Sequence, residues 1–262
     1  MVLQVYVDDS TTERDNFVLA GYIGTAEEWM KFSNEWTPLA RQWGTLQNDG
    51  NYVFKMSDMA WNPERMKRVS AFYRVIEKHA LAGFSFGINR RSFKRALSRL
   101  TVKGVDLNRT NLANVYHLLF NFLVANVTRL VNSRLDMFPP DQKIDFYFDV
   151  QCEKTMILSS WDDFVERSAP DFRMRFGATP RFERDTDFMP LQAADFWAWW
   201  NSHWMDTGEP GFDGAFDVHR RVISARHFVS EDEAVRTLKR VIGSQMPGAV
   251  IYEHRLAGEE SR

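Results

Sequence analysis

The stretch that decides the fold is Leu3–Ser10 (LQVYVDDS), near the start of the chain. Val5 and Val7 face one way, whereas Tyr6 and Asp8 face the other, which is the alternation of a β-strand. The strand ends in two adjacent aspartates, and open α/β sheets build their sites at the carboxyl ends of strands. The same acids could instead form a polar hairpin turn. The pattern therefore predicts which side chains share a face of the strand, while the role of its acids depends on the rest of the chain.

The composition excludes several classes of protein. The chain has 262 residues, of which 44% are hydrophobic and 26% charged, which is typical of a globular fold of one large domain or two small ones. The net charge of −2 provides no global attraction to nucleic acid or membranes, so nucleic-acid binding would require a local basic patch. Cys152 is the only cysteine, and no apolar run is long enough to cross a bilayer, so a cytoplasmic protein without a membrane partner is expected.

Hydrophobic periodicity predicts an alternating series of strands and helices. Thr25 and Glu28 form a capping box before a helix that Pro38 is expected to kink or split, and residues 44–59 are expected to be irregular. The other predicted elements are strands at 17–24 (antiparallel to the first), 83–89, 144–150, 172–182 (at or near the sheet edge) and 249–254, and helices at 62–76, 111–131, from about 155, from about 190, and at 231–242.

The strand at 144–150 (IDFYFDV) repeats the pattern of the first strand. Both strands read apolar, Tyr, apolar, Asp, and both lose their hydrophobicity at the acid. If the two strands are parallel neighbours, Asp8 and Asp149 emerge side by side, and carboxylates so close repel each other unless a cation or proton intervenes. The alternative is that Asp149 caps the following helix and that the repeat is chance.

A third acid, Asp195, falls on the apolar stripe of the helix that begins near Pro190. A carboxylate there is costly unless it is paired or bound to a metal ion. Pairing with an arginine or capping of a nearby turn would also explain it. Asp185 and Asp187 precede the helix, where acids often act as caps.

Basic residues in two segments are candidates for binding a phosphate backbone, although such runs are usually solvated surface. They are Arg90 and Arg91 after the strand at 83–89, and Arg173 and Arg175 in the predicted strand at 172–182. Lys55 and Asp58 could also reach toward a site, but a solvated loop explains them better.

Two motifs together resemble a known family. Tyr6-Val7-Asp8-Asp9-Ser10, followed by the FVLAG strand, and Leu191-Gln192-Ala193-Ala194-Asp195 are similar to the motifs of the uncharacterised DUF3800 family, which has an N-terminal YxDES-type strand and a C-terminal LQxAD helix. The resemblance covers roughly residues 3–204. Asp9 stands where the family has Glu, Thr11 where Gly is usual, and Phe188 where Ser is common.

The resemblance implies an α/β, ribonuclease H-like fold with a mixed central sheet and flanking helices over residues 1–206. Residues 207–262 are then a C-terminal, helical elaboration packed on the same domain. It also implies a nuclease-type metal site, in which Asp8, Asp149 and Asp195 are catalytic metal ligands. Asp187 is taken as the acid before the helix and as a further metal ligand, with Asp185 as its competitor. Asp9 and Gln192 have supporting roles.

The leading functional hypothesis is hydrolysis of a nucleic-acid phosphodiester bond with one or two Mg²⁺ or Mn²⁺ ions, since hard cations prefer oxygen ligands. Whether the nucleic acid is DNA or RNA stays open. The alternatives are a non-catalytic binding or scaffold module of the same fold, and a metal-dependent hydrolase of a small phosphorylated molecule. The aromatic helix near residue 190 could serve either the core or a homodimer.

Overall fold

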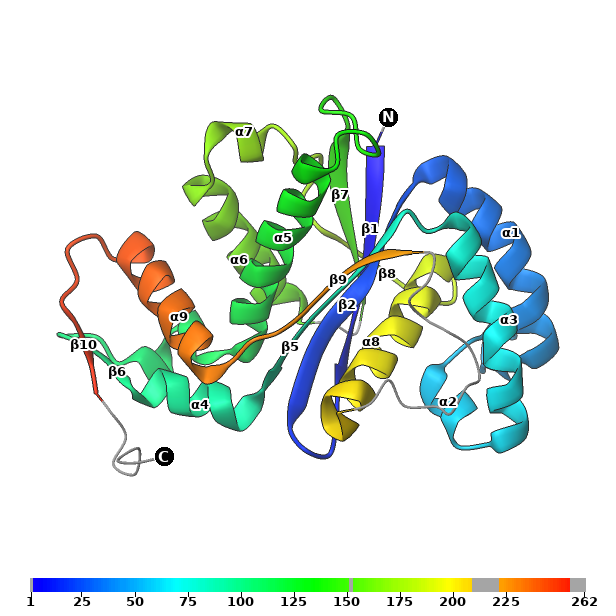
Figure 1. Cartoon of the computed structure of the whole chain (residues 1–262), viewed down its shortest axis with the longest axis horizontal. Helices are drawn as coiled ribbons and strands as arrows, with labels where there is room; N and C mark the ends of the chain where they lie inside the picture. Colours follow the sequence, from blue (N-terminus) through cyan, green and yellow to red (C-terminus); the bar gives the residue numbers. More distant parts are fainter. Residues whose placement is uncertain (1, 151–152, 209–221, 255–262) are drawn as a thin grey trace.

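The computed structural model describes residues 2–150, 153–208 and 222–254 and shows a mixed α/β fold (Figure 1). Cys152 lies outside the described residues. The centre is a six-stranded sheet in the order β8-β7-β1-β2-β5-β9. Its strands are β1 (Val2–Thr11), β2 (Asn16–Thr25), β5 (Ala82–Asn89), β7 (Lys143–Asp149), β8 (Arg181–Glu183) and β9 (Ile223–Phe228).

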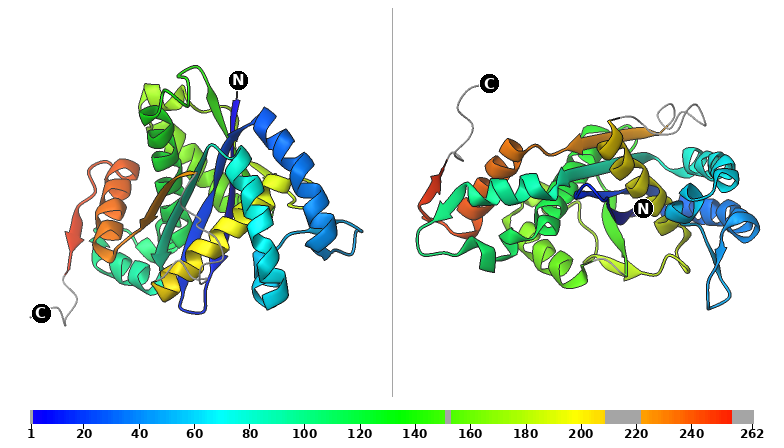
Figure 2. Two further views of the ribbon diagram at one scale, coloured as in Figure 1. Left: turned by 45° about the vertical axis from the view of Figure 1, so that its right-hand side comes forward. Right: turned by 90° about the horizontal axis from the view of Figure 1, so that it is seen from below.

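Helices cover both faces of this sheet, so the protein has three layers (Figures 1 and 2). One face carries α1 (Ala26–Trp43), α2 (Met56–Ala60), α3 (Pro63–His79) and α8 (Met189–Thr207). The other carries α4 (Arg90–Ser98), α5 (Val115–Ser133), α6 (Lys154–Arg167) and α9 (Glu231–Gln245). The short elements are the β3 (Thr45–Leu46) and β4 (Tyr52–Val53) hairpin, the pair β6 (Leu100–Val102) and β10 (Ile251–Glu253), and helix α7 (Pro170–Arg173).

The alternation in β1 divides the core as the sequence predicts. Val5 and Val7 are fully buried in the core beneath α5 and α6, whereas Tyr6 belongs to the core beneath α1 and α8. β2 is antiparallel to β1, and a Cβ on Gly21 would lie 1.8 Å from the carbonyl oxygen of Tyr6. A glycine at position 21 therefore allows the two central strands to pair, and this packing role accounts for it.

Two of the predicted helix starts are confirmed by their caps, although the Glu28 carboxylate binds Lys31 and His79 and so does not complete the predicted capping box. The Thr25 hydroxyl accepts a hydrogen bond from the Glu28 N–H (3.2 Å), and the Asn62 side chain caps α3 with Pro63 at its first position. Pro38 does not split the first helix, because α1 continues through it to Trp43. A proline removes one hydrogen bond, and the buried aromatic face of α1 can compensate for that loss.

Three sequence predictions are corrected by the fold. Residues 172–182 do not form one strand: the segment begins in helix α7 and contributes only the edge strand β8, from residue 181. Residues 44–59 are not wholly irregular, since they include the β3–β4 hairpin and the start of α2. The C-terminal segment is more than a helical elaboration, because β9 adds a strand to the central sheet beside β5, while the predicted helix and final strand correspond to α9 and β10.

The aromatic helix α8 is part of the core. Phe196, Trp197 and Trp200 are almost completely buried against β1, β2 and α1. Burial within the chain therefore explains its apolar face without a second copy. Among the residues that the structure describes, no helix is both long enough and apolar enough to span a membrane.

Candidate functional site

Asp8 of β1 and Asp149 of β7 lie side by side, as their matching sequences predict. The first strand does not end at its acids, however, because β1 continues to Thr11 through its pairing with β2. The two strands are parallel, with Tyr6 opposite Tyr147 and Val7 opposite Phe148, so Asp8 and Asp149 occupy the next positions. The two tyrosine rings stack with centroids 4.8 Å apart, which fixes the face that both acids share. That face is covered by α8.

Asp195 reaches the same point from α8. Its Oδ2 atom accepts a hydrogen bond from the Met56 N–H (2.8 Å), and its charge is the carboxylate charge that acts most strongly on Asp8. Asp195 does not pair with an arginine in the described contacts; its cationic neighbour is Lys55. The acid on the apolar stripe of the helix therefore belongs to a carboxylate cluster with Asp8 and Asp149.

Lys55 supplies the positive charge of this cluster. Its ammonium lies 2.7 Å from Asp185 Oδ2 and also interacts with Asp195 and Asp8. Burial alone would lower the pKa of Lys55, but these three carboxylates raise it above its ordinary value, so Lys55 stays charged. The sequence signal was a lone cation between the apolar residues Phe54 and Met56. Asp58 has a structural contact instead, since it accepts a hydrogen bond from the Thr45 hydroxyl.

The acid preceding α8 at the site is Asp185, not Asp187. Asp185 is 9% exposed and bound to Lys55, whereas Asp187 is exposed on the turn before the helix. The resemblance favours Asp187, which precedes Phe188 at the position where Ser is common. That motif does not decide this position, because the turn between β8 and α8 directs the two side chains differently.

Gln192 is fully buried and holds the site together. Its Oε1 atom accepts hydrogen bonds from Trp36 Nε1 (2.8 Å) and from the Phe54 N–H (2.9 Å), while its Nε2 donates to the Asp185 carbonyl (2.8 Å). Asp195 accepts a hydrogen bond from the Met56 N–H, so side chains of α8 bind the backbone on both sides of Lys55. Gln192 is thus a positioning residue that fixes both Lys55 and Asp185.

Burial and mutual repulsion raise the pKa values of two acids in the cluster. Burial, then the charges of Asp195, Asp9 and Asp149, hold the pKa of Asp8 well above its usual range, and Lys55 only partly opposes this. Burial also raises the pKa of Asp195 to about 6, against the lowering effects of Lys55 and the Met56 N–H. Asp9, whose N–H donates to Asp8 Oδ1 (2.8 Å), contributes to this repulsion.

The raised pKa of Asp195 predicts a pH-dependent stability. The ordinary aspartate pKa is about 4, so between about pH 4 and pH 6 the folded protein binds more protons at Asp195 than the unfolded chain does. The free energy of unfolding contributed by this group is therefore fully present below pH 4 and is lost as the pH rises to 6. In denaturant titrations with chelator, the free energy of unfolding of the wild type should fall relative to that of Asp195→Asn between pH 4 and pH 6. A constant difference from pH 4 to pH 7 would contradict it.

An open pocket of about 270 Å³ gives access to the cluster. Lys55, Asp149 and Asp185 line it together with Arg184 and residues of the β3–β4 hairpin. In the described ranges, however, no three His, Cys, Asp or Glu side chains are already arranged so that they could hold a metal ion. As the cluster stands, the Lys55 ammonium is its counterion.

Of the four arginines predicted to bind a phosphate backbone, Arg173 and Arg175 lie at the wrong end of β7. Residue 175 pairs with the start of this strand, where its carbonyl accepts from the Ile144 N–H, about 16 Å of strand from Asp149. Arg175 is 4% exposed, and its guanidinium donates to Asn132 and to the carbonyls of four residues. Arg175 is therefore structural, and the exposed Arg173 on α7 is too far from the acids to serve them.

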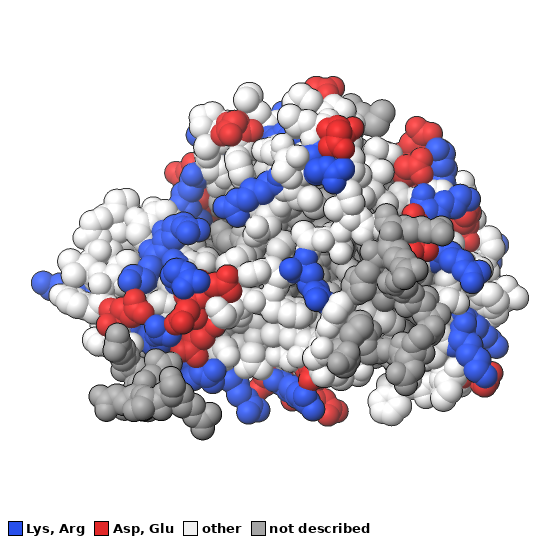
Figure 3. Space-filling view, in the orientation of Figure 1, with Lys and Arg blue, Asp and Glu red and all other residues white. Residues whose placement is uncertain are grey.

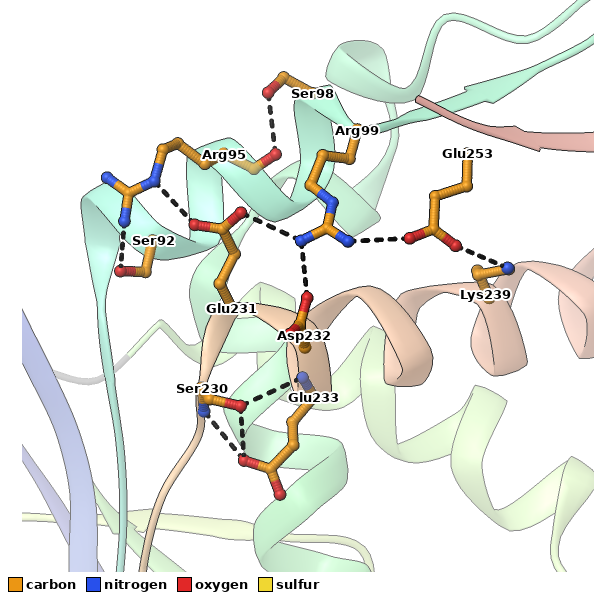
Figure 4. A network of polar contacts seen from close by, with 10 residues as sticks. All are labelled: Ser92, Arg95, Ser98, Arg99, Ser230, Glu231, Asp232, Glu233, Lys239 and Glu253. Carbon is orange, nitrogen blue, oxygen red and sulfur yellow. Dashed lines mark hydrogen bonds and ion pairs between the residues drawn. The ribbon is translucent and has the colours of Figure 1, made fainter. Parts of the chain in front are cut away.

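The basic run that begins at Arg90 is mostly neutralised. Arg90 packs over the ring of Phe17 (4.5 Å), and Arg91 pairs with Asp15 (2.9 Å). Farther along α4, Arg95 and Arg99 bind acids from α9 and β10, as Figure 4 shows for Glu231, Asp232 and Glu253. The run therefore attaches the C-terminal segment to α4. On the face seen in Figure 3, groups of basic side chains are bordered by acidic ones.

Comparison with protein-family models, with curated proteins and with solved structures gives no match to this chain.

Proposed function

We propose that the chain is a metal-dependent phosphodiester hydrolase, a nuclease of ribonuclease H-like architecture related to the DUF3800 family. The observation that carries this proposal is the meeting of Asp8, Asp149, Asp185 and Asp195 around Lys55 at the carboxyl end of the parallel β1–β7 pair. The sheet supports the fold assignment: of its six described strands, β2 alone runs opposite to the rest, and β1 lies centrally.

The chemistry of the donor set fits Mg²⁺ or Mn²⁺. All four acids offer oxygen ligands, and a divalent cation would relieve the repulsion that raises the pKa of Asp8 and Asp195. Asp8 and Asp149 would hold the ion, with Asp195 or Asp185 completing the set after a side-chain rotation. A bound cation would supply an acidified water and neutralise charge developing on the phosphate.

The chain's own residues perform the remaining tasks. Gln192 and Asp195 accept hydrogen bonds from the N–H groups of the residues on either side of Lys55 and so fix its position. The Lys55 ammonium would neutralise a nonbridging phosphate oxygen. Arg184, at the rim of the pocket and half-exposed beside Asp49, would bind the adjoining backbone phosphate, in place of the arginines expected from the sequence. Gln192 would act only through the positions of Lys55 and Asp185, because its side chain is fully occupied.

Metal binding gives the direct test. Saturating Mn²⁺ or Mg²⁺ is expected to stabilise the wild-type protein, by about 2.7 kcal/mol at a hundred times the Kd. Asp149→Asn should lose most of the shift, and Asp187→Asn, which changes an exposed acid outside the cluster, should keep it. Thermal unfolding with and without the metal measures this. If neither metal shifts the wild-type midpoint, a non-catalytic binding module is the better assignment.

Substrate panels then separate the nuclease from a small-molecule hydrolase. Single-stranded, duplex and hybrid DNA and RNA are incubated with Mn²⁺ beside phosphorylated nucleotides and sugars. Cleavage of a polymer that requires Asp8 supports the nuclease. Turnover of small phosphate esters alone, or cleavage that survives Asp8→Asn, contradicts it.

A further inference from the structure

A second and larger pocket adjoins the carboxylate cluster. It has a volume of about 490 Å³, within the range of small-molecule sites. It lies between the end of β1 with its following turn, α2, and the C-terminal half of α8, which Figure 1 shows beside the β1–β2 turn. Ser10 in its wall is two residues beyond Asp8, and Ser57 follows Met56, whose N–H is bound by Asp195. A chain bound at the acids would therefore extend directly into this pocket.

One wall of the pocket is aromatic. Trp61 at the end of α2 lines this pocket and has 89% of its surface exposed. Trp199, one turn after Asp195 on α8, stacks on His203 with centroids 5.1 Å apart and planes at 7°. The exposed ring of Trp61 is thus a surface on which a planar ligand can stack, and the Trp199–His203 pair lines the pocket beside it.

The other wall is polar and held rigidly. The hydroxyls of Ser10 and Ser202 are 2.9 Å apart, and Thr12 and Asn16 both donate to Asp206 Oδ1. Its charged side chains are two acids, Glu13 and Asp206, and one cation, Arg14, whose guanidinium donates to the Asp206 carbonyl. A bare phosphate would not be favoured between these groups, whereas a neutral heteroaromatic ring with hydrogen-bonding edges would be.

We infer that this pocket binds an unpaired nucleobase next to the scissile phosphate, so that the substrate is single-stranded or presents an extruded base. The inference rests on the proposed function for the position of the phosphate. Stacking on aromatic side chains is a sequence-tolerant way to bind single strands. A base within an intact duplex cannot enter such a pocket without leaving its stack.

The test measures binding in chelator, where no cleavage interferes. Fluorescence anisotropy compares a labelled single-stranded oligonucleotide with an abasic oligomer of equal length and charge. Trp61→Ala is expected to weaken binding of the oligonucleotide by about 5- to 100-fold, the scale of one lost stacking contact, and to leave the abasic oligomer unaffected. Trp61→Tyr should restore the affinity, and Trp61→Leu should not.

Met30→Ala is the matched control, because Met30 is an exposed apolar side chain on α1 that does not line the pocket. Trp61 contributes little buried surface, so its variants should remain folded, which circular dichroism checks. Equal affinity of wild type and Trp61→Ala, equal binding of both oligomers, or preference for a blunt duplex overturns the inference. Base-dependent binding through Trp61 in chelator, with no cleavage of the same oligonucleotide after Mn²⁺ is added, would uphold this subsite while refuting the nuclease proposal.

Discussion

Asp8→Asn is expected to abolish metal-dependent cleavage and at the same time to stabilise the metal-free protein. Asp8 lies where the pairing of β1 with β7 ends, among Asp195, Asp9 and Asp149, and both burial and these charges disfavour its ionised form. The substitution keeps the shape of the side chain and an oxygen that can accept from the Asp9 N–H, but it removes one negative charge from the cluster. The repulsion then falls, and so does the ability to hold a cation.

The expected loss of cleavage is at least about 10²- to 10³-fold, the scale of removing one preorganised electrostatic group from an active site. The expected gain in stability appears as a higher unfolding midpoint in chelator at pH 7 and as a smaller gain on adding Mn²⁺. A site that is stabilised by losing its functional group is typical of strained catalytic centres. Initial cleavage rates and denaturant titrations measure the two effects.

Asp187→Asn is the control for Asp8→Asn, because it removes the same charge from an exposed position close to the cluster in sequence. It should change neither the rate nor the midpoint appreciably. Equal activity of the two variants would remove Asp8 from the mechanism. A metal-free Asp8→Asn protein less stable than the wild type would show that the carboxylate is structural.

The sequence predicts those features of the site that depend on regular strands and helices. Alternation in β1 and β7 assigns Asp8 and Asp149 to one face, and the buried stripe of α8 singles out Asp195. These inferences are local, since each needs only the period of one element and one rule about parallel strands. These rules place Asp8 and Asp149 together, and the resemblance to the DUF3800 motifs adds Asp195 to them before any coordinates are known.

The irregular segments are where the sequence is insufficient. Lys55 and Asp185 come from loops whose positions depend on Gln192, and Gln192 binds Phe54 and the Asp185 carbonyl across 138 and 7 residues of chain, respectively. No periodicity records such a contact. The FRMRF segment has the alternation of a strand but does not form one. Its Arg175 is buried, and its guanidinium donates to carbonyls at the end of α5 and in the loop after it.

Lys55→Met is expected to destabilise the metal-free protein by about 2–3 kcal/mol, which is somewhat less than the usual cost of breaking a fully buried ion pair. The Lys55 and Asp185 side chains are 28% and 13% exposed, so solvent screens part of their attraction. Methionine preserves the apolar stem of the lysine, so the change isolates its charge. Without the ammonium, Asp8, Asp185 and Asp195 have no neighbouring cation among their described contacts.

Lys67→Met provides the control, because Lys67 and Glu64 form an ion pair of similar length (2.6 Å) in which both side chains are about 70% exposed. Its loss should cost no more than about 0.5 kcal/mol. The double variant Lys55→Met/Asp185→Asn should recover much of the stability, since the unpaired carboxylate is gone. Comparable costs for the two lysines, measured by urea unfolding, would show that Lys55 does not compensate the cluster.

Added Mn²⁺ connects this stability to the proposed chemistry. If the ammonium and a metal ion neutralise the same carboxylates, Lys55→Met should gain more from saturating Mn²⁺ than the wild type does, because the ion relieves a larger repulsion. Cleavage should nevertheless stay impaired, since the ammonium that is proposed to neutralise the phosphate is missing. A rescue of stability without a rescue of rate would therefore assign Lys55 to the reaction as well as to the fold, whereas recovery of both would reduce it to a counterion.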